Sequence, residues 1–121
     1  MDGSNPTTDE IPIDREYLSG VSGEDVEFER ELTESYLQAS PELIEKLRGA
    51  ISSGDVAAVR HAAHTLKGSS RAIGAEPMGA VCEVLEHQAR DGNLDGAEPR
   101  LEAIERLYKV LSAYIRETWS I

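Results

Sequence analysis

Residues 55–74 read DVAAVRHAAHTLKGSSRAIG, and this stretch determines the fold class that the sequence predicts. Asp55 is a preferred residue for the N-cap of a helix, and Gly74 is suited to ending one. Between them, apolar and small residues recur at intervals of three and four, which places their side chains on one face of an α-helix. The sequence therefore predicts an amphipathic helix over 55–73, with an inner stripe of Val59, Ala62, Ala63, Leu66, Ser69, Ser70 and Ile73.

Helical periodicity also runs through the rest of the chain. Ser40-Pro41 predicts a helix start, because Ser is a favoured N-cap and Pro a favoured first helical residue. Asp95 and Glu98 have the spacing of a capping box and predict the start of the last helix. We expect helices over 13–18, 22–39, 40–53, 55–73, 77–91 and 95–118. The inner face of the helix over 22–39 would carry Phe28, Leu32, Tyr36 and Ala39.

Short loops between amphipathic helices favour antiparallel packing. The predicted fold is all-α: an antiparallel four-helix bundle with additional N-terminal helices, built from 40–53, 55–73, 77–91 and 95–118. An alternative makes 22–39 the fourth bundle member, with the last helix extending beyond it. We expect a helical domain over 13–119, preceded by a flexible polar tail over 1–12.

Composition restricts the partners and the location. The 121 residues fit one domain, and their formal net charge of −11 repels nucleic acid and anionic lipid. No apolar run approaches the roughly 18–20 residues needed to span a bilayer, and the N-terminus lacks the pattern of a signal peptide. Cys82 is the only cysteine, so no disulfide closes within the chain. We expect a cytoplasmic protein that binds neither nucleic acid nor membranes.

The predicted helix over 55–73 carries a second, polar face. A neutral imidazole, with an ordinary pKa of about 6.5, keeps a nitrogen lone pair that can attack the phosphorus of an acyl phosphate. Lys67 lies one turn from His64 and is suited to neutralising the oxygens of a bound phosphoryl group. Gly68 costs the helix about 1 kcal/mol relative to Ala, but leaves the histidine open to a large partner. This face contains His64, Lys67, Gly68 and Arg71, with Arg60 and His61 one turn earlier.

Residues 63–70 read AHTLKGSS, and Ile73-Gly74-Ala75 and Cys82-Glu83-Val84-Leu85-Glu86 follow. In these residues the chain resembles the histidine-containing phosphotransfer (HPt) domain family, and the resemblance covers roughly residues 13–118. It implies that His64 is the phosphoacceptor through Nε2, that Lys67 binds the phosphate and that Gly68 gives access. Glu86 stands where the family places a polar group that hydrogen-bonds the histidine. Arg71 and Arg90 are weaker candidates for residues near the phosphate.

The resemblance also implies a function. Such a protein relays a phosphoryl group to and from receiver-domain aspartates in a multistep two-component phosphorelay, and it is not a turnover enzyme. Its partners are response-regulator receiver domains and a hybrid histidine kinase, and the expected state is a monomer. No cofactor is expected, because the receiver supplies Mg²⁺. An apolar docking patch is expected from Ile13, Tyr17, Leu18, Val21, Phe28 and Thr65, with the alternative that Leu18 and Phe28 belong to the core.

Two other functional hypotheses remain. In the first, the chain is a receiver-binding helical adaptor that transfers no phosphate. In the second, it is the phosphoacceptor domain of a larger hybrid histidine kinase. The presence of His64 argues against the adaptor, and Met1 with its polar tail favours a free-standing protein. His61 and His64 have a spacing that can hold a metal. No Cys or acidic ligand joins them at a suitable spacing, so we expect no metal.

Overall fold

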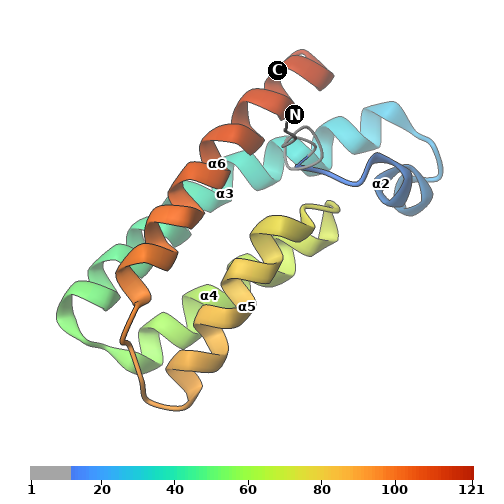
Figure 1. Cartoon of the computed structure of the whole chain (residues 1–121). Helices are drawn as coiled ribbons and strands as arrows, with labels where there is room; N and C mark the ends of the chain where they lie inside the picture. The colour runs from blue at the N-terminus through green and yellow to red at the C-terminus, as the bar shows by residue number, and fades with distance from the viewer. Residues whose placement is uncertain (1–11) are drawn as a thin grey trace, which may run out of the picture.

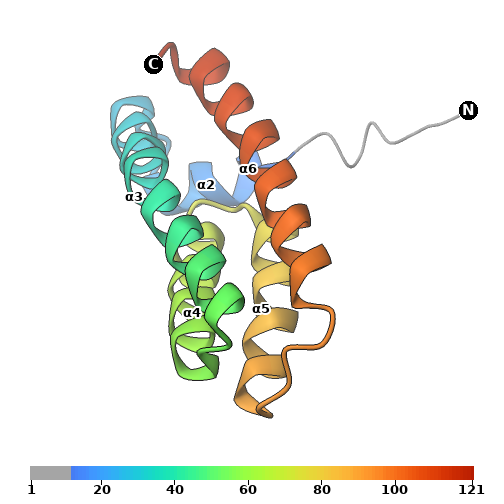
Figure 2. The ribbon, with the colours of Figure 1, turned by 90° about the vertical axis from the view of Figure 1, so that its left-hand side faces the viewer.

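A computed structural model describes residues 12–121 of the chain (Figure 1). This part is all-α, as the sequence predicts. Four long helices form an antiparallel bundle in which consecutive helices pack together and the last packs back on the first (Figure 2). A short helix precedes them and packs on the N-terminal part of the first long one. The elements are α2 (Arg15–Ser22), α3 (Val26–Ser53), α4 (Val56–Ala72), α5 (Glu76–Arg90) and α6 (Ala97–Trp119).

Aspartate caps begin the first three of these helices. The Asp55 carboxylate accepts a hydrogen bond from the backbone N–H of Ala58 at 3.1 Å, which confirms the predicted start of α4. Asp14 and Asp25 cap α2 and α3 in the same way. Gly54 ends α3 with φ of 74°, a left-handed conformation that glycine adopts without steric cost. The tight turn places α3 and α4 side by side.

The predicted helix start at Ser40-Pro41 is wrong, because α3 runs unbroken through both residues. The Ser40 hydroxyl donates back to the carbonyl of Tyr36 at 2.7 Å instead of capping a new helix. Proline has no N–H to offer the carbonyl four residues earlier, which belongs to Leu37. The Tyr108 hydroxyl of α6 donates to that carbonyl at 3.0 Å. The fourth bundle member is therefore the whole of α3, and the segments 22–39 and 40–53 are not separate helices.

Three other predicted details differ from the structure. The last helix starts at Ala97 after Gly96, whose φ is 78°, and no side chain caps it, so Asp95 is not its N-cap. The first helix spans Arg15–Ser22, passes through Gly20 and ends at Gly23, whose left-handed conformation stops it. Of the predicted inner face of 22–39, Tyr36 is buried, whereas Phe28 and Ala39 are exposed. The face of α3 that is buried there instead carries Glu29, Thr33, Tyr36, Leu37 and Ser40.

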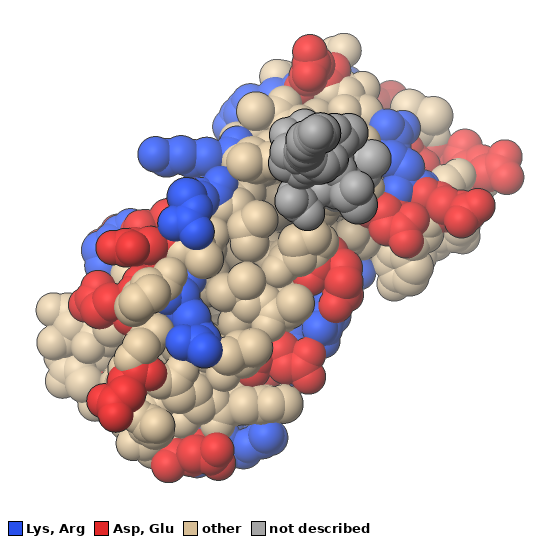
Figure 3. All heavy atoms as spheres, in the orientation of Figure 1, with Lys and Arg blue, Asp and Glu red and all other residues tan. Residues whose placement is uncertain are grey.

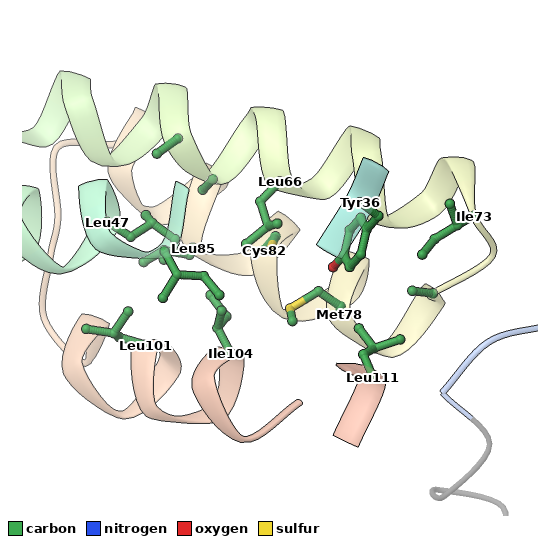
Figure 4. Packing of buried hydrophobic residues seen from close by; sticks show 14 of the residues in the cluster. Tyr36, Leu47, Leu66, Ile73, Met78, Cys82, Leu85, Leu101, Ile104 and Leu111 are labelled. Atoms are coloured by element: carbon green, nitrogen blue, oxygen red, sulfur yellow. The ribbon is translucent and has the colours of Figure 1, made fainter. Parts of the chain in front are cut away.

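The core lies between the four long helices. Leu66 of α4, Leu85 of α5 and Ile104 of α6 are fully buried and point toward one another's helices (Figure 4). Cys82 is buried among them as a free thiol, and burial raises its pKa to about 12. A bundle packed in this way holds α4 and α5 in fixed register, and the candidate site lies on those two helices.

The two ends of the expected domain differ in what the structure describes. The tail predicted over residues 1–12 lies outside the described residues except for Pro12, which is buried. At the other end, α6 continues to Trp119. None of the helices in the described range combines the length and the apolar character needed to cross a membrane.

Candidate functional site

His64 projects from the outer face of α4. Its neighbours Ala63 and Leu66 are fully buried, whereas the His64 side chain is 64% exposed. The helical spacing predicts this separation of faces. The imidazole is therefore held on a rigid element and is accessible from outside the bundle.

The His64 ring is oriented by Glu86 of α5. The Glu86 carboxylate oxygen Oε2 lies 2.9 Å from Nδ1 of His64, and the Glu86 side chain is only 10% exposed. Its other oxygen, Oε1, lies 2.7 Å from Nζ of Lys67. No other donor in residues 12–121 reaches that buried oxygen. One carboxylate thus bridges the imidazole and the ammonium group.

The ionised Glu86 carboxylate determines which nitrogen of the neutral ring carries the proton. The Lys67 ammonium holds the pKa of Glu86 below its ordinary value, against the opposing effect of burial, and the bond from His64 lowers it further. The ionised carboxylate accepts hydrogen bonds only, so Nδ1 carries the proton. In the neutral ring this leaves the lone pair on Nε2, which is the nucleophilic nitrogen.

Gly68 lies on the same exposed surface, one turn after His64. A Cβ atom built at this position would meet nothing within 4 Å, so packing inside the chain does not require a glycine. Its backbone is ordinary helix. The missing side chain therefore contributes only open space beside the imidazole.

A hollow of about 370 Å³ adjoins the ring on the side of the preceding turn. Its walls come from α4 and from Glu86 of α5. Sequence reasoning placed Arg60 and His61 near His64 but did not assign them to the site. The spacing of four residues between Arg60 and His64 is the sequence signal that could have placed Arg60 in the site. The lining residues are Ala57, Arg60, His61, His64 and Glu86.

The family model described as "Hpt domain" matches residues 31–114, which include all of α4 and α5. This chain belongs to the Hpt domain family. The crystal structure of histidine-containing phosphotransfer protein B (HptB) from Pseudomonas aeruginosa PAO1 superimposes with a TM-score of 0.85. The two sequences are 27% identical, and the superposition covers 91% of this chain and 96% of the HptB chain.

A curated relative is named as a phosphorelay protein. The phosphorelay intermediate protein rdeA of Dictyostelium discoideum is 31% identical over 98% of this chain. The chain spans 46% of the length of rdeA. The likeness therefore concerns the Hpt region and leaves more than half of rdeA without a counterpart here.

In this Hpt domain, the two arginines that are weaker candidates for residues near the phosphate have different surroundings. The Arg71 guanidinium binds Glu76 at 3.0 Å and Glu83 at 2.8 Å, both on α5. It also covers Gly79, where a Cβ atom would lie 2.8 Å from the Arg71 side chain. Arg71 therefore ties α4 to α5, and it is Lys67 that shares a carboxylate with His64. Arg90 is exposed in the last turn of α5, one turn beyond Glu86.

The predicted docking residues divide into two groups. Ile13 and Leu18 are fully buried, so their assignment to a docking surface is wrong and they belong to the core. Their periodicity could not show that α2 would fold onto the bundle. Thr65 is exposed next to His64, and its hydroxyl donates to the His61 carbonyl. Around α2 and the start of α3, the exposed apolar residues are Tyr17, Val21, Phe28 and also Val26, which the prediction omitted.

In the part of the chain that the structure describes, no group of three or more His, Cys, Asp or Glu side chains is arranged so that it could hold a metal ion. Within residues 12–121, no third side chain joins His61 and His64 as a ligand.

Proposed function

We propose that this Hpt domain is a phosphorelay carrier, which accepts a phosphoryl group on Nε2 of His64 from a receiver aspartate and passes it to another. The observation that supports this most directly is the bridge formed by Glu86. An exposed imidazole whose Nδ1 is hydrogen-bonded to a buried carboxylate presents Nε2 as a fixed nucleophile.

The transfer balances without a further co-reactant. The Nε2 lone pair forms a bond to phosphorus while the bond between phosphorus and the aspartyl oxygen breaks, and the aspartate leaves as a carboxylate. The ring gains positive charge as the N–P bond forms, and the adjacent Glu86 carboxylate stabilises it. The reverse reaction delivers the phosphoryl group to a second aspartate.

Lys67 would neutralise the new charge on the phosphoryl oxygens. Its ammonium group has three N–H donors, and its Nζ atom lies 2.7 Å from Oε1 of Glu86 in the free protein. Three donors are enough for Glu86 and for a phosphoryl group on the neighbouring turn. Lys67 therefore binds phosphate without giving up its contact with Glu86.

The chain is a carrier and not a turnover enzyme, it binds no cofactor, and Mg²⁺ resides in the receiver. Its partners are response-regulator receiver domains and an upstream hybrid histidine kinase, and it acts as a cytoplasmic monomer. The exposed, oriented ring of His64 supports transfer over a purely adhesive role.

A phosphotransfer assay tests the proposal. A receiver carrying phosphate on its aspartate is mixed with the wild-type chain, with His64→Gln and with His61→Gln. His61 is the matched control, because it is exposed on the same helix one turn earlier. We expect acid-labile, base-stable labelling of the wild type and of His61→Gln, and none of His64→Gln. Full labelling of His64→Gln rules out the assignment.

A further inference from the structure

Helix α4 differs in charge from every other helix in the described range. It contains Arg60, Lys67 and Arg71 and no Asp or Glu, whereas α2, α3, α5 and α6 all carry acidic residues. The chain as a whole has a net charge of −11. In the view of Figure 3, acidic and basic side chains are interspersed over the surface. The helix that bears His64 is therefore a local exception on an acidic protein.

The three cations of α4 are not equally available to a partner. Lys67 is paired with Glu86, and Arg71 is paired with Glu76 and Glu83. Arg60 is exposed, and no carboxylate in residues 12–121 lies within ion-pair distance of it. Among Arg60, Lys67 and Arg71, it is the one cation that no described carboxylate neutralises.

Arg60 also lines the hollow beside the reacting ring. It shares that wall with His61, His64 and Glu86, and it stands one helical turn before His64. An anionic group that enters the hollow thus meets an arginine next to the imidazole. Removal of the Arg60 side chain breaks no hydrogen bond or ion pair within the described residues, so its role can be tested without disturbing the fold.

We propose that Arg60 is a docking residue, which binds a carboxylate on the receiver surface around the phosphoaspartate. This inference rests on the proposed function. A receiver that reacts with His64 brings the anionic charge of its phosphoaspartate toward a protein of net charge −11. Repulsion must be offset at the contact itself, and an unpaired arginine does so through a two-pronged hydrogen bond to a carboxylate.

The lining of the hollow favours a protein partner over a free anion. Glu86 contributes a negative charge to the same wall, which opposes the binding of a small phosphate that has no other contacts. A carboxylate on a receiver is held in place by the rest of the interface. The proposed contact therefore adds rate and affinity to docking and takes no part in the bond exchange.

The experiment compares Arg60→Gln with Arg106→Gln. Arg106 is exposed on α6, and no carboxylate in the described part pairs with it, so both variants change the net charge equally. Single-turnover transfer from a phosphorylated cognate receiver is measured over a range of receiver concentrations and salt concentrations. We expect Arg60→Gln to lower the second-order rate constant about tenfold and to weaken its salt dependence, with a saturating rate within about twofold of wild type. Arg106→Gln should match the wild type.

Two results would overturn the proposal. Equal second-order rate constants for the two variants would show that Arg60 makes no contact with the receiver. Inhibition of the wild type by millimolar inorganic phosphate, lost in Arg60→Gln, would show that the hollow is a site for a free anion.

Binding of the unphosphorylated receiver, measured by titration calorimetry, separates this inference from the proposed function. A chain that binds the receiver through Arg60 but accepts no phosphate would contradict the carrier function and retain the docking contact. Equal affinities of Arg60→Gln and Arg106→Gln in this assay would count against Arg60 alone.

Discussion

The hydroxyl group of Tyr108 replaces the backbone donor that Pro41 lacks. Tyr108 lies on α6, and its Oη atom donates to the Leu37 carbonyl of α3 at 3.0 Å. In an uninterrupted helix that carbonyl would accept the N–H of residue 41. The contact explains how α3 continues through Pro41, and it also joins the first and last helices of the bundle.

We expect Tyr108→Phe to lower the free energy of unfolding by about 1–2 kcal/mol, because it leaves a partly buried carbonyl without a donor. Urea unfolding followed by circular dichroism measures the change. The helix should remain formed, so the change should lie in the unfolding midpoint and not in the folded spectrum.

Pro41→Ala provides the matched background for this measurement. An alanine at position 41 supplies the missing N–H, so Leu37 no longer depends on Tyr108. The effect of Tyr108→Phe should shrink in that background. A double-mutant cycle with no coupling energy would show that the hydroxyl does not compensate for the proline.

The sequence predicts local features well and tertiary compensation poorly. Gly54 fixes the turn between α3 and α4 through its left-handed backbone, and Asp55 does so through its side-chain cap, so residue type alone predicts the turn. Ser40-Pro41 carries an equally strong local signal for a helix start. That signal fails because the opposing contribution comes from Tyr108, which is far away in the sequence. No local pattern contains that information.

The same distinction applies to the candidate site. The spacing of His64 and Lys67 predicts that they share the polar face of the helix. The structure places both side chains beside Glu86, with His64 64% exposed and Lys67 20% exposed. The resemblance to the HPt family indicates a partner for the ring at Glu86. The Glu86 carboxylate also contacts Lys67, and this contact depends on the distance between α4 and α5, which only the packed bundle sets.

Lys67→Met should raise the pKa of Glu86. In the folded wild type the Lys67 ammonium is the main cause of the lowered pKa, and burial acts in the opposite direction. Without the ammonium, burial dominates and the carboxyl group protonates at higher pH. Carbon-13 NMR titration of the Glu86 side chain measures the shift. Phosphotransfer to His64 should also slow, because the positive charge beside the phosphate is lost.

Arg71→Met is the control for this titration. Arg71 is the main cause of the lowered pKa of Glu83, so that variant should raise the pKa of Glu83 and leave that of Glu86 in place.

Because the pKa of Glu86 is lowered on folding, Glu86 stabilises the wild type above its unfolded pKa. This contribution is lost as the pH falls through the folded value. A Glu86 pKa that is the same in wild type and Lys67→Met would contradict the bridge.

Gly68→Gln should make the protein more stable and a poorer phosphate acceptor. Replacement of an exposed helical glycine raises the free energy of unfolding by about 0.5–1 kcal/mol. A Cβ atom at this position meets nothing within 4 Å, so we expect the longer side chain to enter the open space beside His64 that a docked receiver would occupy. Thermal unfolding and single-turnover transfer measure the two effects.

Gly68→Ala separates backbone stabilisation from obstruction. It should give a similar gain in stability with a much smaller loss in transfer rate, because it adds only one methyl group. Equal transfer by wild type, Gly68→Ala and Gly68→Gln would show that the receiver does not approach over this position.

Val21→Glu should weaken receiver binding. Val21 is 49% exposed in α2, near the exposed Tyr17 of the same helix and Phe28 at the start of α3. These three residues are the apolar part of the predicted docking surface that is still exposed. A carboxylate there would be desolvated on docking without a partner, which we expect to cost about tenfold in affinity. Val110→Glu is the matched control, because Val110 is 43% exposed on α6 and the substitution introduces the same charge. Titration calorimetry with a cognate receiver compares them. If the two variants bind equally well, docking takes place away from α2, and the contacts around His64 on α4 must supply the affinity.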